Sequence, residues 1–399
     1  NVPNLRFKEF EGEWEKCMVS DLLDFYSTNS LSWDKLEYDT DAIQNLHYGL
    51  IHVGLPIMVD LNKDKLPNIM DGNTPKNYEL CQEGDIAFAD ASEDTNEVAK
   101  VVEFYNLGEK KVICGLHTIH GRDRQGKTVV GYKGYAFSST TFHHQIRKIA
   151  QGTKIYSISC KNFSECYVGI PSKDEQTKIV TLLRMIDERI STQNKIIEDL
   201  KKLKSAIIEI EYSSKTKTSS HIGDFIVQTS KRNKDNAIQT VLSVSNRQGF
   251  IQQSEQFENR CVASDDTSNY KIVERNDFAF NPARINVGSI ARLITFEKGI
   301  VSPMYICFRT KDYATPEYLD YFFESKLFFT EIQKRLEGSV RQCLSYESLC
   351  NIPFPLLAIE VQQRIGKQLF TLAQKIKLET DFLEILHRQK QYLLRQIFI

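Results

Sequence analysis

The chain contains two copies of one sequence pattern, and this repeat constrains the fold more than any other feature. When the sequence is shifted by 186 positions, residues 132–159 align with residues 318–345, and nine of these 28 positions are identical. Such a repeat indicates two structural units of one kind rather than a single large core. The identical pairs are Tyr132/Tyr318, Tyr135/Tyr321, Phe137/Phe323, Ser139/Ser325, Phe142/Phe328, Ile146/Ile332, Lys148/Lys334, Gly152/Gly338 and Ser159/Ser345.

The same shift continues into two long helical patterns. In both, mostly apolar residues recur at alternating spacings of four and three, as in a coiled-coil seam. We expect the two helices to pair; the alternative is two unrelated amphipathic helices, each lying on its own domain. The first seam comprises Ile179, Leu183, Ile186, Ile190, Gln193, Ile197, Leu200 and Ile207, and the second comprises Ile365, Leu369, Leu372, Ile376, Glu379, Leu383, Leu386 and Leu393.

Shorter matches precede each helix at other offsets, as insertions in loops would produce. These segments alternate in polarity or are β-branched, and Gly, Pro and Asn bound them, so each module is expected to be strands and loops with a helix or two. The matches pair residues 84–90 with 276–282, 113–117 with 301–305, and Ser20-Asp21 with Gly223-Asp224.

The predicted fold class is α+β, with two tandem modules that are each followed by a long helix. At 399 residues and 41% hydrophobic content, the chain is too long for one ordinary core and apolar enough to be globular. The predicted boundaries are 1–170 for the first module, 171–212 for the first helix, 213–221 for a linker, 222–354 for the second module and 355–399 for the second helix.

The short linker determines how the helices pair. It places the second module near the C-terminal end of the first helix, and that module is fused to the N-terminal end of the second helix. Paired helices must therefore form an antiparallel coiled coil, with a pseudo-twofold relation between the two halves. A seam from Ile179 to Ile207 is about 40 Å long at 1.5 Å per residue, close to one turn of B-DNA, roughly 34–36 Å. We expect Gln193 and Glu379 to meet at the middle of the seam and to fix its register.

Charge is segregated along the first half of the chain, although the formal net charge is only −1. Residues 1–104 hold 8 Lys/Arg against 21 Asp/Glu, a balance of −13, and residues 105–154 hold 9 against 2, a balance of +7. A local basic field favours a polyanionic ligand; the alternative is a solvated basic face beside an acidic one.

Because the sequence has neither a run of 18 apolar residues nor an apolar N-terminal block, we expect a cytoplasmic location.

Together these features resemble the specificity subunits of type I restriction-modification systems. The resemblance covers almost the whole chain and is carried by residues 3–14 (PNLRFKEFEGEW), 115–122, 281–289 and the Pro-then-Glu-Gln segment 170–179. The second copy of that segment, 352–365, departs by two extra residues after the proline, which affects only the loop length.

The resemblance implies a non-catalytic subunit with two target recognition domains, each of which reads one half of a bipartite, asymmetric DNA target. It further implies helical regions that dock two methyltransferase subunits, and additional translocase and nuclease subunits in the complex. S-adenosylmethionine, ATP and Mg would be bound by those partners, with no cofactor in this chain.

No catalytic centre and no metal site are expected. Residues 121–128 match a Walker A pattern, but a β-branched, glycine-broken segment follows where the pattern needs a helix start. A basic loop that contacts DNA phosphate is the preferred interpretation. Asn281-Pro282 lacks the second proline and the aromatic residue of a methyltransferase motif, and His143-His144 lacks a third ligand. The nine cysteines form no CxxC pair or zinc-spaced Cys/His cluster, so they are interpreted as reduced thiols that mostly pack.

Candidates for DNA contact are side chains that could reach base edges or phosphates. Arg284 and Arg341 are the leading candidates for reading bases, because each lies in a loop rich in Gly, Ser or Asn. For each candidate the alternative is a solvent-exposed polar group. The first module offers Arg122, Arg124, Lys127, Lys133, His143, His144, Arg147 and Lys154, and the second offers Lys231, Arg232, Arg247, Asn281, Arg284, Asn286, Lys334, Arg335, Arg341 and Gln342.

One loop differs sharply between the two modules. Residues 89–97 correspond to residues 281–289 but are acidic. Carboxylates can accept a hydrogen bond from cytosine N4, or the loop could bind a protein, and the sequence leaves both roles open. The difference predicts that the modules read different sequences.

Two other functions compete with DNA recognition, namely a protein-interaction scaffold with two ligand-binding modules and a nucleotide-hydrolysing enzyme based on residues 121–128.

Overall fold

The computed structural model describes residues 2–213, 219–246, 248–253, 266–338 and 342–399. The chain divides into two compact units, Asn1–Gln193 with Phe382–Ile399, and Asn194–Asp381. Each unit holds one module and part of both long helices, because α6 (Lys173–Glu211) and α12 (Ile359–Gln396) each contribute to both units. The predicted five-part division of the chain stays a prediction.

The first module contains two mixed sheets and several short helices. One sheet has the strand order β2-β11-β7-β9-β5 and the other β10-β4-β6-β3, and two-stranded pairs join β1 to β13 and β8 to β12. The strands are β1 (Glu15–Met18), β2 (Asp24–Tyr26), β3 (Leu36–Glu37), β4 (Gln44–Leu46), β5 (Met58–Asp60), β6 (Asn68–Ile69), β7 (Ile86–Ala89), β8 (Ala91–Ser92), β9 (Val101–Asn106), β10 (Val112–Cys114), β11 (Thr118–Arg122), β12 (Tyr156–Ser157) and β13 (Tyr167–Ile170). The helices are α1 (Val19–Leu22), η1 (Trp33–Lys35), α2 (Tyr48–His52), α3 (Tyr132–Phe137), α4 (Thr140–Ile149) and α5 (Cys160–Ser164).

The second module has two four-stranded sheets, in the orders β14-β21-β18-β19 and β16-β15-β20-β17. Its strands are β14 (Ile226–Thr229), β15 (Val241–Ser245), β16 (Gly249–Gln252), β17 (Lys271–Glu274), β18 (Phe278–Phe280), β19 (Ile290–Arg292), β20 (Lys298–Val301) and β21 (Ile306–Thr310). Its helices are α7 (Ile222–Phe225), η2 (Ile285–Val287), α9 (Pro316–Phe322), α10 (Lys326–Gln333) and α11 (Tyr346–Cys350). The prediction of α+β modules with long helices is therefore confirmed.

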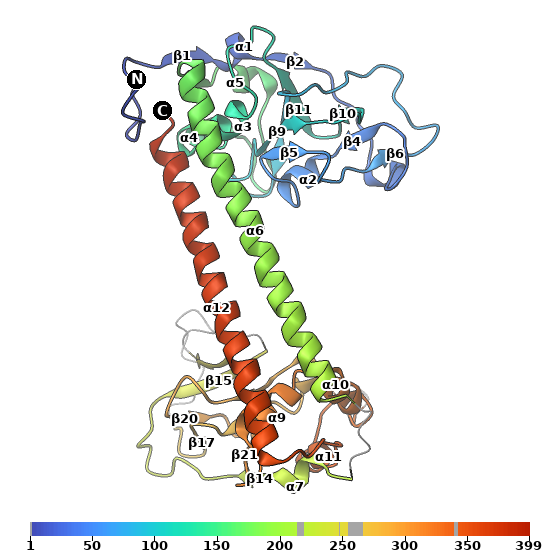
Figure 1. Ribbon diagram of the computed structural model, residues 1–399, viewed down its shortest axis with the longest axis vertical. Coiled ribbons are helices and arrows are strands. Elements are labelled where there is room, and N and C mark those ends of the chain that lie inside the picture. Colours follow the sequence, from blue (N-terminus) through green and yellow to red (C-terminus); the bar gives the residue numbers. More distant parts are fainter. Residues whose placement is uncertain (1, 214–218, 247, 254–265, 339–341) are drawn as a thin grey trace. The chain divides into compact units, whose positions relative to one another are not determined.

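The long helices pack against each other in antiparallel directions, as predicted. In the first unit the start of α6 shares a core with the end of α12, where Ile179 and Leu183 cluster with Leu386 and Leu393 (Figure 1). In the second unit the end of α6 shares a core with the start of α12, through residues that include Ile208 and Ile365. All sixteen predicted seam residues are buried or half-buried. None of the helices in the described ranges is both long and apolar enough to cross a membrane.

A buried glutamine anchors the start of each long helix in the same way. The amide oxygen of Gln176 accepts the backbone N–H of Val129, and its nitrogen donates to the carbonyls of Lys127 and Pro171. Gln362 makes the equivalent three bonds, to residues that are each 186 positions further along the chain. Its partners are Thr315, Tyr313 and Leu357. The two extra residues in the second copy therefore lie outside this anchor.

Four strands of one sheet in the first module are also equivalent to the four strands of one sheet in the second. β2, β11, β7 and β9 correspond to β14, β21, β18 and β19, because both series share their order and their antiparallel pairing. Ile86 aligns with Phe278 in the 84–90 and 276–282 match, and the strand partners of these two residues are Glu103 and Arg292. Glu103 and Arg292 thus occupy equivalent positions.

The N-terminal segment packs on the ends of both long helices within the first unit. Arg6 donates two hydrogen bonds of 2.8 Å to the buried carboxylate of Glu175, next to the anchoring glutamine. The backbone N–H of Leu5 donates to the carbonyl of Gln396, and the ring of Trp14 meets the edge of Phe398. The segment 3–14 and the Glu-Gln pair of the first helix, which carried part of the resemblance, therefore contact each other.

Candidate nucleic-acid interface

A short hairpin lies beside a loop in each module, and together they form what we call the hairpin–loop surface. The hairpins close on the bridges Gln151↔Ser157 and Glu337↔Cys343, which are related by the 186-residue shift. The residue after each hairpin donates its backbone N–H to the loop, over 3.0 Å in both modules. The loops are residues 89–97 in the first module and 281–289 in the second. The repeat therefore places the loop that differs most in charge at the same position in both modules.

In the second module the loop presents a cation. The Asn281 side chain accepts the backbone N–H of Ala283, and a left-handed Gly288 (φ 89°) closes the turn after η2. This backbone leaves Arg284 exposed and Asn286 half-buried. Asn281 is itself only 6% exposed. We correct the prediction for Asn281, because its buried amide supports the loop rather than facing a ligand.

In the first module the same surface has mixed charge. Arg147 of α4 is exposed and donates to Asn96 of the acidic loop over 3.0 Å. Lys154 is exposed on the hairpin, and β12 of the hairpin pairs with β8 of the loop. Acidic and basic side chains are therefore neighbours here, whereas the corresponding loop of the second module carries Arg284.

Arg122 is not a free cation, contrary to our expectation. Its guanidinium donates to both carboxylate oxygens of Asp85, to Glu79 and to the carbonyl of Leu80, at 2.7–2.8 Å. Arg309 makes the equivalent contact with Asp277 in the second module, at 3.0 Å. The repetition of this pair identifies Arg122 as a residue that holds the sheet together.

Lys133 is also removed from the candidate interface. It is 3% exposed and pairs at 3.0 Å with the fully buried Glu103. The same carboxylate accepts the backbone N–H groups of Gly131 and Gly134. Burial raises the pKa of Glu103, and the ammonium of Lys133 opposes that rise. The pair fixes α3 on β9 and leaves Lys133 no access to a ligand.

Two further cations of the basic segment are partly neutralised by acidic residues from earlier in the chain. Arg124 is exposed but lies 3.4 Å from Asp24, and Lys127 lies 3.1 Å from Glu15. Charge that is segregated in the sequence is thus mixed in space, because the strands of the first module bring residues 1–104 against residues 105–154. The basic field expected from composition is correspondingly weaker.

The other candidates differ in exposure. His143 is half-buried, and burial lowers its pKa, whereas His144 is exposed. Arg335 is half-buried and pairs with Glu331. Arg247 and Arg341 lie outside the described residues. The candidates that are exposed in the second module are Lys231, Arg232, Arg284, Lys334 and Gln342.

The Walker A pattern does not form a phosphate-binding loop before a helix. Its first residues, Gly121 and Arg122, belong to strand β11. Its last residue, Thr128, is held by Asp123, whose carboxylate accepts both the backbone N–H and the hydroxyl of Thr128. The helix α3 begins only at Tyr132, after a left-handed Gly131. The carboxylate of Asp123 thus occupies a backbone amide that a phosphate would need.

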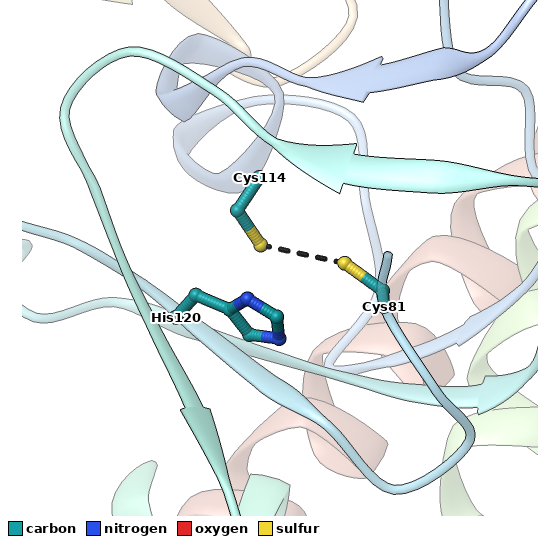
Figure 2. A group of neighbouring side chains, drawn as sticks. All are labelled: Cys81, Cys114 and His120. Atoms are coloured by element: carbon teal, nitrogen blue, oxygen red, sulfur yellow. Dashed lines mark hydrogen bonds between the residues drawn. The ribbon is translucent and has the colours of Figure 1, made fainter. Parts of the chain in front are cut away.

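Three side chains from separate segments of the chain lie close together in the structure. Cys81, Cys114 and His120 are buried in the first module, and their potential ligand atoms all lie within 4.8 Å of one another (Figure 2). These residues have no zinc-like spacing in the sequence, but the fold brings their side chains together. The signal that could have found them is the register of the strands, because Leu80 bridges Ile113 across the sheet.

No protein-family model matches the sequence, and no curated protein matches it. Solved structures match the fold over its full length. A type I restriction-modification system S subunit from M. genitalium is 16% identical, with a TM-score of 0.60 over 100% of this chain and 99% of that chain.

A chain from a structure concerned with complex assembly and conformational transition of the type I R-M system is also similar. It is 12% identical, with a TM-score of 0.58 over 97% of both chains. Two modules, two antiparallel helices and a match that runs from end to end lead to one conclusion: this chain has the fold of a type I restriction-modification specificity subunit.

Proposed function

We propose that this chain is the DNA-recognition subunit of a type I restriction-modification complex. Each module reads one half of a bipartite, asymmetric target, and the long helices dock two methyltransferase subunits. The chain itself performs no catalysis, and S-adenosylmethionine, ATP and Mg are bound by partner subunits, which include the translocase and nuclease. The complex acts in the cytoplasm.

The observation that carries this proposal is the full-length match of a doubled architecture. The similarity extends over both modules and both helices, with 99% of the M. genitalium S subunit covered. A shared single domain would support only a shared module. A shared arrangement of two modules and two helices supports a shared task that needs both halves.

The hairpin–loop surfaces support the asymmetry of the target. They occupy equivalent positions, but one presents Arg284 and the other an acidic loop with Arg147 and Lys154 beside it. Arginine reads guanine through two hydrogen bonds, whereas a carboxylate can accept one from cytosine N4. Two surfaces of such different chemistry suit two different half-sites.

The exposed faces of the long helices support the docking of partner subunits. Ile196, Leu203 and Ile210 form a row at seven-residue spacing on α6 and are 39%, 50% and 74% exposed. A second row on α12 consists of Leu378, Ile385 and Tyr392, which are 64%, 52% and 59% exposed. Repeated apolar side chains on one face of a helix are typical of a helix that packs against another protein.

The proposal is tested by co-expressing the chain with a cognate methyltransferase subunit and mapping adenine methylation across a genome. We expect methylation at one bipartite motif. Arg284→Ala should weaken the preference at one base of one half-site by about 1–3 kcal/mol and leave the other half-site unchanged. Lys298→Ala, which removes an exposed lysine elsewhere in the second module, is the matched control. Methylation without any motif would refute the proposal.

A protein-interaction scaffold remains the alternative function, and the mixed charge of the first module is the observation that favours it. Salt separates the two functions. A chain that neutralises DNA phosphates loses affinity for duplex DNA steeply as the salt concentration rises, because the release of counterions into the solution becomes less favourable. Affinity for DNA that does not change between low and high salt would favour the scaffold.

A further inference from the structure

The buried Cys81–Cys114–His120 group has the chemistry of a metal site. Cys81 precedes β7, Cys114 ends β10, and His120 lies in β11, so three separate segments supply the three side chains. They are 7%, 2% and 0% exposed. Thiolate sulfur and imidazole nitrogen are the ligands that zinc prefers in proteins.

The distances fit a common ligand. The two sulfur atoms are 3.6 Å apart, which is far longer than a disulfide bond of about 2.05 Å. Two sulfur atoms that share one tetrahedral zinc at about 2.3 Å are separated by about 3.8 Å. The pair is therefore close to the spacing that a shared zinc ion requires. Figure 2 shows the imidazole of His120 beside the two sulfur atoms.

One ring nitrogen of His120 has no partner within the protein. Its Nε2 lies 2.8 Å from a carboxylate oxygen of Asp85, but its Nδ1 is buried and makes no hydrogen bond. A buried polar atom without a partner is costly. A metal-bound histidine usually gives its second nitrogen to a carboxylate, which fixes the ring and strengthens the metal bond. The Asp85 contact supplies that arrangement, and Arg122 holds Asp85 in turn.

The local charges also balance around a divalent cation. Two thiolates neutralise a zinc ion, and the Asp85 carboxylate is neutralised by Arg122. A divalent cation would therefore stabilise the two thiolates at this position.

We propose that Cys81, Cys114 and the Nδ1 atom of His120 bind a zinc ion in the first module. The ion joins the two sheets, because β10 belongs to one and β11 to the other. Among the described residues of the second module, the positions aligned with these three ligands do not form an equivalent set. Its aligned residues are Val273, Ser302 and Cys307.

The test measures metal in the purified full-length chain after expression in zinc-supplemented medium. Elemental analysis should give about one zinc per chain. The double variant Cys81→Ser/Cys114→Ser should lose at least about nine-tenths of it. Cys307→Ser is the matched control, since it removes a buried cysteine from the equivalent position of the second module, and it should keep the zinc.

A second measurement does not depend on how well the variants fold. The wild-type chain is stripped with a chelator and refilled with cobalt(II), whose absorption reports thiolate ligands directly. We expect a sulfur-to-cobalt charge-transfer band, and a melting temperature that falls on stripping and recovers with zinc but not with magnesium. A chain without zinc that shows no cobalt–thiolate band overturns the proposal, as does a Cys81–Cys114 disulfide in the metal-free native protein. Neither result would depend on DNA binding.

Discussion

The two modules bury ion pairs of opposite polarity at the same place. In the first module the strand β9 supplies the acid, Glu103, and the helix α3 supplies the base, Lys133. In the second module the strand β19 supplies the base, Arg292, and the helix α9 supplies the acids, Glu317 and Asp320. The comparison shows that the repeat preserves a charged contact between strand and helix, while the sign of each partner is free to change.

At this contact the first module uses backbone N–H groups, and the second module uses side-chain carboxylates at the same positions. Gly131 and Gly134 of the first module align with Glu317 and Asp320 of the second. Where the strand carries the carboxylate, glycines let their backbone N–H groups approach it, and a Cβ at Gly134 would lie only 3.2 Å from the Glu103 side chain. In the second module the strand carries the guanidinium of Arg292, and the positions equivalent to the two glycines carry the carboxylates. The polarity is thus set by several residues together, and one substitution cannot reverse it.

The largest effect is expected from breaking these pairs. Glu103→Ala leaves the Lys133 ammonium buried without a counter-charge, so it should lower the free energy of unfolding of the first module by about 3–5 kcal/mol. Arg292→Ala should cost about half as much, because the side chain of Glu317 is 39% exposed and water can solvate it.

Two signals separate the modules in a urea titration. Both tryptophans, Trp14 and Trp33, belong to the first unit, so their fluorescence follows that unit, whereas far-ultraviolet circular dichroism follows both. Glu198→Ala, which removes an exposed ion pair with Lys202, is the control and should change stability little. Equal losses for Glu103→Ala and Arg292→Ala would contradict the comparison.

The glutamine anchors should respond equally, because their contacts are the same. Gln176→Ala and Gln362→Ala each remove three buried hydrogen bonds and leave backbone groups unsatisfied, so each should cost about 2 kcal/mol. Urea unfolding by circular dichroism measures both losses. A difference of more than about 1 kcal/mol between them would show that the two helix starts are not energetically equivalent.

Acid should act in opposite directions on two carboxylates, Asp320 in the second module and Asp85 in the first. Burial raises the pKa of Asp320 to about 6, although Arg292 opposes the rise. Its folded form therefore holds a proton more tightly than the unfolded chain does, where the pKa is about 4. The stability from this group is present below pH 4 and is lost as the pH rises from about 4 to about 6.

In the first module, burial raises the pKa of Asp85, but hydrogen bonds from Arg122 and His120 outweigh it, so the net pKa is lowered. Its contribution is present above the ordinary pKa of an aspartate and is lost as the pH falls through the lowered value. Asp320→Asn should therefore reduce the gain in stability of the second module on acidification from pH 7 to 4, by about 2 kcal/mol. The midpoints in urea at several pH values check this. An unchanged pH dependence would exclude Asp320 as the titrating group.

The smallest change in stability is expected from replacing the polar residues of the two seams. Gln193 is 5% exposed, and Glu379 forms an ion pair with Lys375 one turn earlier in its helix. Replacing both Gln193 and Glu379 with Leu should raise the melting temperature by a few degrees, about 1 kcal/mol, at the expense of a unique register. Differential scanning calorimetry measures the change. A clear fall in the melting temperature would show that the polar pair stabilises the helices.

The sequence predicted the long helices and the α+β modules well, because these elements depend on local periodicity. The seam positions from Ile179 to Leu393 and the α+β modules follow from spacings that are visible within a few turns or strands. The repeat added long-range information, because it aligned Tyr132 with Tyr318 before any contact was known. The spacing of one DNA turn between the modules stays a prediction.

The functional residues were harder to predict because their partners are far away in the sequence. Arg122 and Lys133 were counted as free cations, but Asp85 and Glu103 reach them through strand pairing. The same pairing brings Cys81 to Cys114 without any CxxC spacing. Composition gives the number of charged side chains and thiols. The register of the sheet determines which charges are neutralised by a partner and which thiols lie close together.

The reversed ion pairs have a consequence for folding. A chain with two copies of one fold can dock the helix of one copy on the sheet of the other, a characteristic error of tandem repeats. Such a cross-docked product would bury Glu103 against Glu317 and Asp320, or Arg292 against Lys133, with like charges in a water-poor interior. The opposite polarity of the two ion pairs would therefore disfavour the cross-docked product relative to the native one.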